Sequence, residues 1–288
     1  MRFLTIRTEQ GDRLAVRDGD SVVDLNQAIP AVPSDLVAAL TAGVDLLAAG
    51  SDAIASNPAR IPYAGLSLAP LVPRPGKIIC VGLNYQAHAA EGGRPPPKYP
   101  QFFLRSATSL VAANQPGLRP FVSEQFDYEA ELAVVIGKKG RHIKAEHALD
   151  HVFGYAPFND MSVRDYQKRT PQWTIGKNFD HTGGFGPELV TADELPPGAK
   201  GLRLQAILNG NVMQDANTDE MIWNVTDLIV LLSECLTLEP GDVIVTGTPA
   251  GVGAFREPPV WMKNGDRIEI VIEKVGTLVN EIRDEKEQ

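Results

Sequence analysis

The sequence predicts a β-rich α+β fold with a small N-terminal α/β lobe. Short apolar segments alternate with turns that contain Gly, Asn or Asp along most of the 288 residues, a pattern typical of many strands joined by short connections. Helical periodicity is clear in only two segments. Prolines are dense over residues 58–75, which we interpret as a linker. We therefore expect two units, residues 1–72 with the linker and residues 73–288.

The N-terminal unit combines strands with one helical segment. Alternating apolar residues predict strands at 2–7, 14–16 and 22–25, with turns at 11–12 and 18–19. Residues 34–56 are rich in Ala and Leu at near-helical spacing and predict a helix, with Ser34 or Asp35 as its N-cap. Because this unit has no cluster of chemically active side chains, we expect it to be accessory.

The second unit reads as a succession of strands. We predict strands at 78–81, 131–136, 204–208, 243–246 and 268–272, with turns at 209–210, 240–242 and 264–266. A helix is expected over residues 224–236, with Asn224 or Thr226 as its cap. The apolar side of this helix would carry Leu228, Leu231, Leu232 and Cys235.

Composition and charge exclude several classes of protein. The chain has 27 Lys and Arg against 36 Asp and Glu, a net charge of −9, and no basic run, so we expect no nucleic-acid partner. No segment is apolar enough to span a bilayer, and charges interrupt the first residues, so we expect neither a membrane partner nor a signal peptide. Cys80 and Cys235 are too few for a disulfide framework or a cysteine zinc site, which favours a cytoplasmic location.

Acidic residues alternate along one segment. Asp127, Glu129 and Glu131 occupy every second position, so on a strand their side chains would share one face. Carboxylates that face the same way repel one another unless a cation lies between them, and all-oxygen ligands select a hard cation, Mg²⁺, Mn²⁺ or Ca²⁺. The alternative is a solvated sheet face, and this segment alone leaves both interpretations open.

A second segment offers a general base. If residues 85–91 are helical, His88 and Glu91 are neighbours at positions i and i+3. A carboxylate beside an imidazole fixes its tautomer and favours its charged form, and such a pair can activate water. The alternative is a surface pair without a function.

Further polar residues follow around position 160. Asp160 is either the cap of a helix that follows or a third metal ligand. Arg164 and Gln167 would lie on a similar face of that helix, and Arg suits bidentate binding of a carboxylate. Lys177 is a cation in an apolar, aromatic setting.

Five motifs together resemble the fumarylacetoacetate hydrolase family over residues 77–282. They occur in the family's order: G-L-N-Y-x-x-H-A-x-E at 82–91, D-Y-E-x-E-L-A-V-V-I-G at 127–137, N-D-M-S-x-R-D at 159–165, G-K-x-F-D at 176–180 and T-G-T-P-x-G-V-G at 246–253. The resemblance implies a mixed β-sandwich roll as the catalytic domain. It also implies a homodimer, since the family is usually dimeric.

The resemblance assigns a role to each matching residue. It implies that Mg²⁺ or Mn²⁺ is held by Glu129, Glu131 and Asp160. The catalytic residues that it implies are His88, Glu91 and Lys177. The substrate-binding residues that it implies are Arg164, Gln167 and Thr248. Residues 92–98 correspond to the mobile lid of relatives.

The resemblance also implies an enzyme that acts on a 2-oxo acid. We expect a Mg²⁺- or Mn²⁺-dependent hydrolase that cleaves the C–C bond of a 2,4-dioxo acid and releases pyruvate or a related 2-oxo acid, because His88 and Glu91 supply a base for water. Decarboxylation of oxaloacetate and isomerisation of a diacid such as 2-hydroxyhepta-2,4-diene-1,7-dioate are the alternatives. A non-catalytic oligomeric scaffold is a remote alternative, because a scaffold does not need His88, Glu91, Lys177 and the carboxylates.

Overall fold

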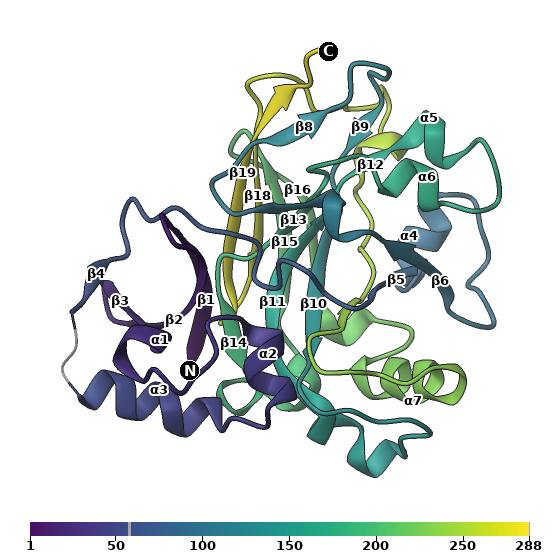
Figure 1. Cartoon of the computed structure of the whole chain (residues 1–288). Helices are drawn as coiled ribbons and strands as arrows, with labels where there is room; N and C mark the ends of the chain where they lie inside the picture. The colour runs from purple at the N-terminus through teal and green to yellow at the C-terminus, as the bar shows by residue number, and fades with distance from the viewer. Residues whose placement is uncertain (57–58, 288) are drawn as a thin grey trace.

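The computed structural model describes residues 1–56 and 59–287 and confirms the β-rich α+β class (Figure 1). Pro58, in the predicted linker, and Gln288, at the end of the second predicted unit, lie outside the described residues. The strands form a 12-stranded sheet, a five-stranded sheet and a two-stranded ribbon.

The strands and helices have the following bounds. The strands of the N-terminal part are β1 (Arg2–Thr8), β2 (Gly11–Asp18), β3 (Ser21–Asp24) and β4 (Ile61–Pro62). The remaining strands are β5 (Ile78–Gly82), β6 (Gln101–Arg105), β7 (Leu110–Ala112), β8 (Gly117–Arg119), β9 (Phe126–Asp127), β10 (Ala130–Ile136), β11 (Val152–Asp160), β12 (Ser162–Val163), β13 (Gly183–Phe185), β14 (Leu189–Thr191), β15 (Arg203–Leu208), β16 (Asn211–Asn217), β17 (Val243–Val245), β18 (Arg267–Ile272) and β19 (Gly276–Asp284). The α-helices are α1 (Leu25–Ala28), α2 (Leu36–Thr41), α3 (Leu46–Ala55), α4 (Gln86–Glu91), α5 (Arg164–Gln167), α6 (Thr174–Lys177) and α7 (Val225–Cys235).

Two sheets enclose the main core. The long sheet runs in the order β4-β3-β2-β1-β14-β11-β10-β17-β5-β6, and the five-stranded sheet runs in the order β16-β15-β18-β19-β8. The central strands β10 and β11 pack against β15, β18 and β19 of the second sheet, and Figure 1 shows these five strands in the middle of the main body. Every residue of β10 is buried, as expected for a strand covered on both faces.

The pairing of β10 with β11 fixes the relative position of the start of β10 and the end of β11. The two strands run antiparallel, with Ala130 opposite Asn159 and Val135 opposite Gly154. The register shifts only between Val135 and Ile136, at the far end of the pair. The regular part of the pairing therefore includes the start of β10 and the end of β11.

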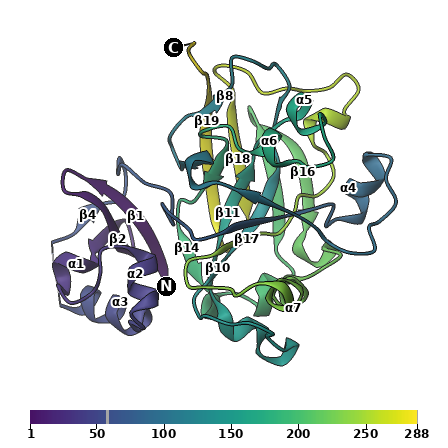
Figure 2. The same ribbon diagram turned by 45° about the vertical axis from the view of Figure 1, so that its right-hand side comes forward.

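The N-terminal part is joined to the rest by a continuous sheet. β1 pairs with β14, with Arg2 opposite Val190 and Phe3 opposite Leu189. In Figure 2 this lobe, in purple, lies to one side of the main body. Because the pairing of β1 with β14 joins the two parts in one sheet, the division between residues 72 and 73 stays a prediction.

Three local predictions for this lobe were wrong. The first turn lies at Glu9-Gln10, and Gly11 already belongs to β2, where it pairs with Thr8. The segment 34–56 forms two helices, α2 and α3, because Gly43 adopts a φ of 71° and Asp45 caps a second helix. The linker contributes β4, which pairs with β3, and Leu68, Leu71 and Val72 belong to the core, so the segment is part of the fold.

Other local predictions hold. β15 and β16 form a hairpin around Asn209-Gly210. Helix α7 begins after Asn224, whose side chain accepts a hydrogen bond from the backbone of Asp227. The buried side of α7 differs slightly from the expectation, because Ile229 is buried there while Cys235 is exposed.

Candidate active site

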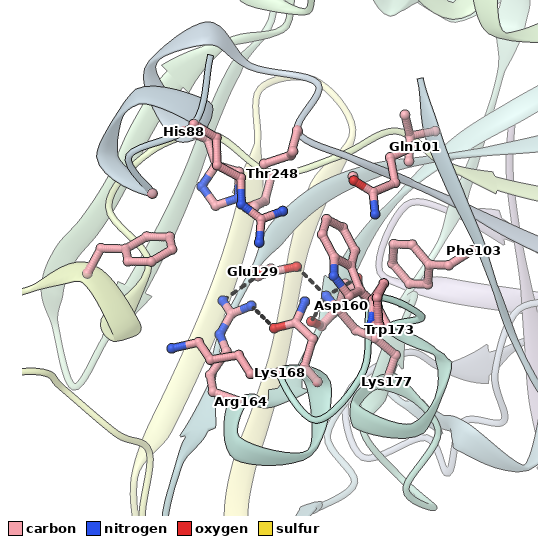
Figure 3. A pocket seen from close by; sticks show the side chains of 18 of the residues that line it. His88, Gln101, Phe103, Glu129, Asp160, Arg164, Lys168, Trp173, Lys177 and Thr248 are labelled. Carbon is pink, nitrogen blue, oxygen red and sulfur yellow. Dashed lines mark hydrogen bonds and ion pairs between the residues drawn. The ribbon is translucent and has the colours of Figure 1, made fainter. Parts of the chain in front are cut away.

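One cavity collects most of the residues that the sequence singled out. Its volume is about 660 Å³. Its walls come from β5, β6, α4, α5, α6 and the loop after β17, and its floor lies at the adjacent ends of β10 and β11 (Figure 3). Of the predicted site residues it is lined by His88, Glu129, Glu131, Asp160, Arg164, Gln167, Lys177 and Thr248. Glu91 lies directly behind His88.

Three buried carboxylates form a candidate metal-binding triad on the floor. Glu129 precedes β10, Glu131 lies in β10 and Asp160 ends β11. The backbone N–H of Asp160 donates to the carbonyl of Glu129 at 3.0 Å, so the strand pairing brings the three together. One ligand oxygen from each lies within 4.8 Å of the others. This is the buried Glu/Glu/Asp set that the predicted cofactor requires.

Asp127 does not join this triad. The chain leaves the strand conformation between β9 and β10, so the strict alternation expected from Asp127 to Glu131 is broken. The Asp127 carboxylate instead accepts hydrogen bonds from the backbone N–H groups of Gly253 and Ala254, at 2.8 and 2.9 Å, and from Arg164 Nε at 2.8 Å. Its role in the structure is to hold Arg164 and the loop around residue 253.

Three buried cations surround the triad. Lys177 Nζ lies 2.6 Å from Glu129 Oε2 and 2.5 Å from Asp160 Oδ2. Arg164 Nη2 lies 2.7 Å from Glu129 Oε1, and Arg105 Nη1 lies 2.5 Å from Asp160 Oδ1. Burial alone would raise the pKa of Glu129, but Lys177 and Arg164 lower that pKa to about 2. Burial likewise opposes the charge on Lys177, yet Asp160 and Glu129 raise its pKa overall.

Glu131 is the member of the triad without a cationic partner. Its Oε2 accepts a hydrogen bond from the backbone N–H of Gly247 at 2.5 Å, and among the described residues it forms no ion pair. Burial raises its pKa well above the usual range, and the charges of Asp160 and Glu129 add to this effect.

The charge balance of the floor fits a divalent cation. Within the described chain, the buried charged side chains of the floor are four carboxylates and three cations: Asp127, Glu129, Glu131 and Asp160 with Arg105, Arg164 and Lys177. The carboxylates therefore outnumber the cations by one, and Glu131 is the carboxylate that lacks a cation. Carboxylate oxygens are the donors that hard cations such as Mg²⁺ and Mn²⁺ prefer, so these residues suit such an ion.

His88 and Glu91 form the predicted pair on α4. His88 Nδ1 lies 2.7 Å from Glu91 Oε1, while Glu91 Oε2 accepts a hydrogen bond from the N–H of Gly251 at 2.8 Å. With Nδ1 engaged, Nε2 is the nitrogen of His88 that can act on a bound molecule. In Figure 3, His88 and Lys177 approach Glu129 from opposite sides.

The predicted substrate-binding residues line the same cavity. Arg164 Nη1 donates to Gln167 Oε1 at 2.9 Å, so α5 presents the two side chains together. Thr248 Oγ1 donates to the carbonyl of Ala130 at 3.0 Å and accepts from Gln214 Nε2 at 2.8 Å. The structure thus brings the predicted residues to one site, and their roles in binding and catalysis remain proposals.

Several other residues of this site were not predicted from the sequence to have a role. Arg105 donates a hydrogen bond to Asp160. In β6 it alternates with Gln101 and Phe103, which line the cavity. Arg94, Lys168 and Arg169 also line the cavity. The sequence signal for the last two was their position as an adjacent basic pair directly after Arg164 and Gln167.

The fold and the site define a metal-dependent enzyme of the fumarylacetoacetate hydrolase type. Residues 77–283 match the family described as fumarylacetoacetate (FAA) hydrolase, C-terminal, and the chain belongs to this family, as the motifs predicted.

Three similar proteins illustrate the range of this family. "Oxaloacetate tautomerase Fahd2a, mitochondrial" from Rattus norvegicus is 41% identical, over 92% of this chain and 84% of its own. Fumarylacetoacetate hydrolase from Exiguobacterium antarcticum has a similar structure, with a TM-score of 0.85, 32% identity and coverage of 99% and 100%. Maleylpyruvate hydrolase from Sphingobium sp. SYK-6, crystallised with manganese(II) and pyruvate, has a TM-score of 0.83, 32% identity and coverage of 99% and 100%.

Location and membrane contact were also predicted. None of the helices in residues 1–56 and 59–287 is long and apolar enough to cross a membrane. The name of the rat relative places that protein in mitochondria, and the cytoplasmic location of this chain stays a prediction.

Proposed function

We propose that this enzyme enolises a 2-oxo diacid of the oxaloacetate type, acting as a metal-dependent tautomerase. The observation that carries the proposal is the His88–Glu91 pair, which faces a buried set of carboxylates and cations across one cavity. Similarity to an oxaloacetate tautomerase over 92% of the chain supports the choice of this reaction.

Glu129, Glu131 and Asp160 would hold Mg²⁺ or Mn²⁺. When bound, such an ion supplies Lewis-acid polarisation of the 2-oxo group and stabilises the negative charge of an enolate. The manganese(II) in maleylpyruvate hydrolase supports this choice of cofactor.

The remaining residues bind the substrate and move the proton. Arg164 and Gln167 would bind the carboxylate next to the 2-oxo group, because a guanidinium matches a carboxylate in two-point binding. His88 would take a proton from C3 through Nε2, while Glu91 holds Nδ1 and stabilises the charged ring. Lys177 places a positive charge where the enolate develops. Delivery of this proton to the enolate oxygen gives the enol. In the opposite direction, the enol loses its hydroxyl proton and C3 receives one.

The test is the rate of oxaloacetate enol–keto conversion by the Mn²⁺-loaded protein. We expect His88→Gln and Glu91→Gln to lower this rate, the former by about 10²- to 10⁴-fold, the usual contribution of a general base. Pyruvate affinity, measured by calorimetry, should stay unchanged because neither side chain belongs to the binding set. His147→Gln, at an exposed histidine that does not line the cavity, is the matched control. Unchanged tautomerisation in His88→Gln would contradict the proposal.

Hydrolysis of a 2,4-dioxo acid is the second candidate. The same His88–Glu91 pair could take a proton from water instead of carbon, and the maleylpyruvate hydrolase structure holds pyruvate together with its metal. Release of pyruvate from a 2,4-dioxo acid faster than oxaloacetate tautomerisation would favour the hydrolase. Rapid loss of CO₂ from oxaloacetate that survives His88→Gln would favour a decarboxylase, since that bond-breaking step consumes no water.

A further inference from the structure

The cavity has a charged mouth as well as a charged floor. The floor groups are buried, whereas Arg94, Lys168 and Arg169 are exposed and line the same cavity. Arg94 follows α4, and Lys168 and Arg169 follow α5. We call these three residues the mouth cluster. Two segments that are distant in the sequence therefore place three cations at one opening.

The mouth cluster has no acidic partner within the described chain. The Arg94 guanidinium lies over the Trp173 ring, 5.8 Å from its centroid, and that of Arg169 lies over Tyr166 at 3.5 Å. Exposed arginines elsewhere do find carboxylates, as in Arg203 with Asp215 at 2.5 Å. Because the whole chain carries a net charge of −9, three unpaired cations at one opening are a local feature. They create a positive potential that attracts an anionic group.

The aromatic platform beneath Arg94 is held in place. Trp173 packs edge-on against Phe103, with ring centroids 5.7 Å apart. A Cβ on Gly82 would lie 2.1 Å from Trp173 Cζ3, so the absence of a side chain at Gly82 is what lets the indole sit there. Arg94 therefore lies over a fixed surface, which reduces the entropy lost when the cluster binds a ligand.

We propose that the mouth cluster binds a second carboxylate of the substrate, and that the preferred substrate is a 2-oxo diacid longer than oxaloacetate. The inference rests on the proposed function for the 2-oxo end, which the floor would bind. A cavity of about 660 Å³ falls within the range of pockets that enclose drug-sized ligands, so it has room for a longer chain. The charge of the mouth requires that the far end of this chain be anionic.

The test compares two ligands that differ only in the far carboxylate. Binding of 2-oxoadipate and of 2-oxohexanoate to the Mn²⁺-loaded protein is measured by calorimetry, with pyruvate as the reference. We expect the diacid to bind about 10- to 100-fold more tightly, as for a charge-assisted hydrogen bond. The variant R94Q/K168Q/R169Q should abolish this difference and leave pyruvate affinity unchanged.

A matched variant controls for net charge. R141Q/K144Q/K200Q removes three exposed cations that do not line the cavity, so it should preserve the preference for the diacid. Equal affinity of the wild type for both ligands would overturn the inference, as would the same loss of preference in both triple variants. Failure of pyruvate and 2-oxohexanoate to bind, with 2-oxoadipate still bound through the mouth cluster, would overturn the proposed function alone. If pyruvate binds but neither six-carbon acid does, the inference fails and the proposed function stands. If none of the three acids binds, both proposals fail.

Discussion

At the scale of single residues, the three carboxylates of the triad are not equivalent. Glu129 and Asp160 each contact Lys177, whereas Glu131 is bound only by a backbone N–H among the described contacts. A buried charge without a counter-charge destabilises a protein unless a cation or a proton compensates it. Glu131 is therefore the position where metal binding and stability are most directly linked.

We predict that Glu131→Gln separates these two properties. The thermal midpoint in the presence of a chelator should equal or exceed that of the wild type, because Gln is neutral, whereas burial opposes the charge of the Glu131 carboxylate and raises its pKa. The rise of the midpoint on adding Mn²⁺, which reports binding to the folded state, should be largely lost. Thermal scans with and without Mn²⁺ measure both. Glu146→Gln, at an exposed glutamate, should behave as the wild type, and a full Mn²⁺-dependent rise in Glu131→Gln would refute the assignment.

Residue spacing alone could predict part of this site. The i, i+2 spacing of Glu129 and Glu131 and the i, i+3 spacing of His88 and Glu91 indicate contacts that the structure contains. The position of Asp127 did not follow from the same spacing, because β9 ends at that residue and the strand is not continuous with β10. Which cation faces which carboxylate depends on segments far apart in the chain, so no local pattern could predict the contact of Arg105 with Asp160.

At the scale of elements, Asp127 connects three segments. It ends β9, binds Arg164 at the start of α5 and accepts hydrogen bonds from the loop at residues 253–254. Gly251 lies just before these residues in the same loop. Its N–H donates a hydrogen bond to the Glu91 carboxylate, and its carbonyl accepts one from Tyr128 Oη at 3.1 Å. The position of α4 thus depends on a loop that Asp127 helps to hold.

We predict that Asp127→Asn strongly destabilises the fold. The substitution removes one partner of a buried ion pair and leaves Arg164 less well compensated, a change that typically costs about 3–5 kcal/mol. The free energy of unfolding from urea titration measures this cost. Asp150→Asn, at an exposed aspartate, serves as the control and should change stability by no more than about 0.5 kcal/mol. A cost for Asp127→Asn as small as that of the control would show that the contact contributes little.

Element boundaries show where sequence patterns are weakest. Gly43 and Asp45 are the sequence signals for the break between α2 and α3. They were missed because the apolar spacing of the segment 34–56 continues across the break. Helix α7 was predicted well because a cap residue, Asn224 or Thr226, coincides with the start of its apolar spacing, and the structure adds a capping box between Asn224 and Asp227. Local signals of this kind define helix ends more reliably than apolar periodicity does.

At the scale of the whole molecule, one end of the long sheet remains open. β6 is the last strand in the order, and Leu104 on it is 54% exposed. Helix α6 packs against β6 and carries Ile175, which is 61% exposed. An apolar sheet edge of this kind is a surface on which proteins associate. The sheet order could not be predicted from the sequence, because neighbours such as β5 and β17 are more than 150 residues apart.

We predict a homodimer that uses the β6 edge. Light scattering at micromolar concentration should give twice the chain mass of 31.1 kDa. Leu104→Glu should shift the protein to the monomer, since it places a charge in the apolar contact. Leu47→Glu, at an exposed leucine of the N-terminal lobe, should remain dimeric. A wild-type mass of one chain would contradict the dimer, and a dimeric Leu104→Glu variant would contradict this choice of edge.

The register between β10 and β11 has a consequence for how this chain tolerates insertion and deletion. The pairing is regular where Glu131 and Asp160 lie, and its irregularity is confined to Val135 and Ile136 at the other end. Residues 137–151, which connect the two strands, can therefore change in length without moving the carboxylates. A single residue added within 131–134 would instead shift the strand by one position and turn its side chains to the opposite face. We therefore expect changes in length to be tolerated at one end of this strand pair and not at the other.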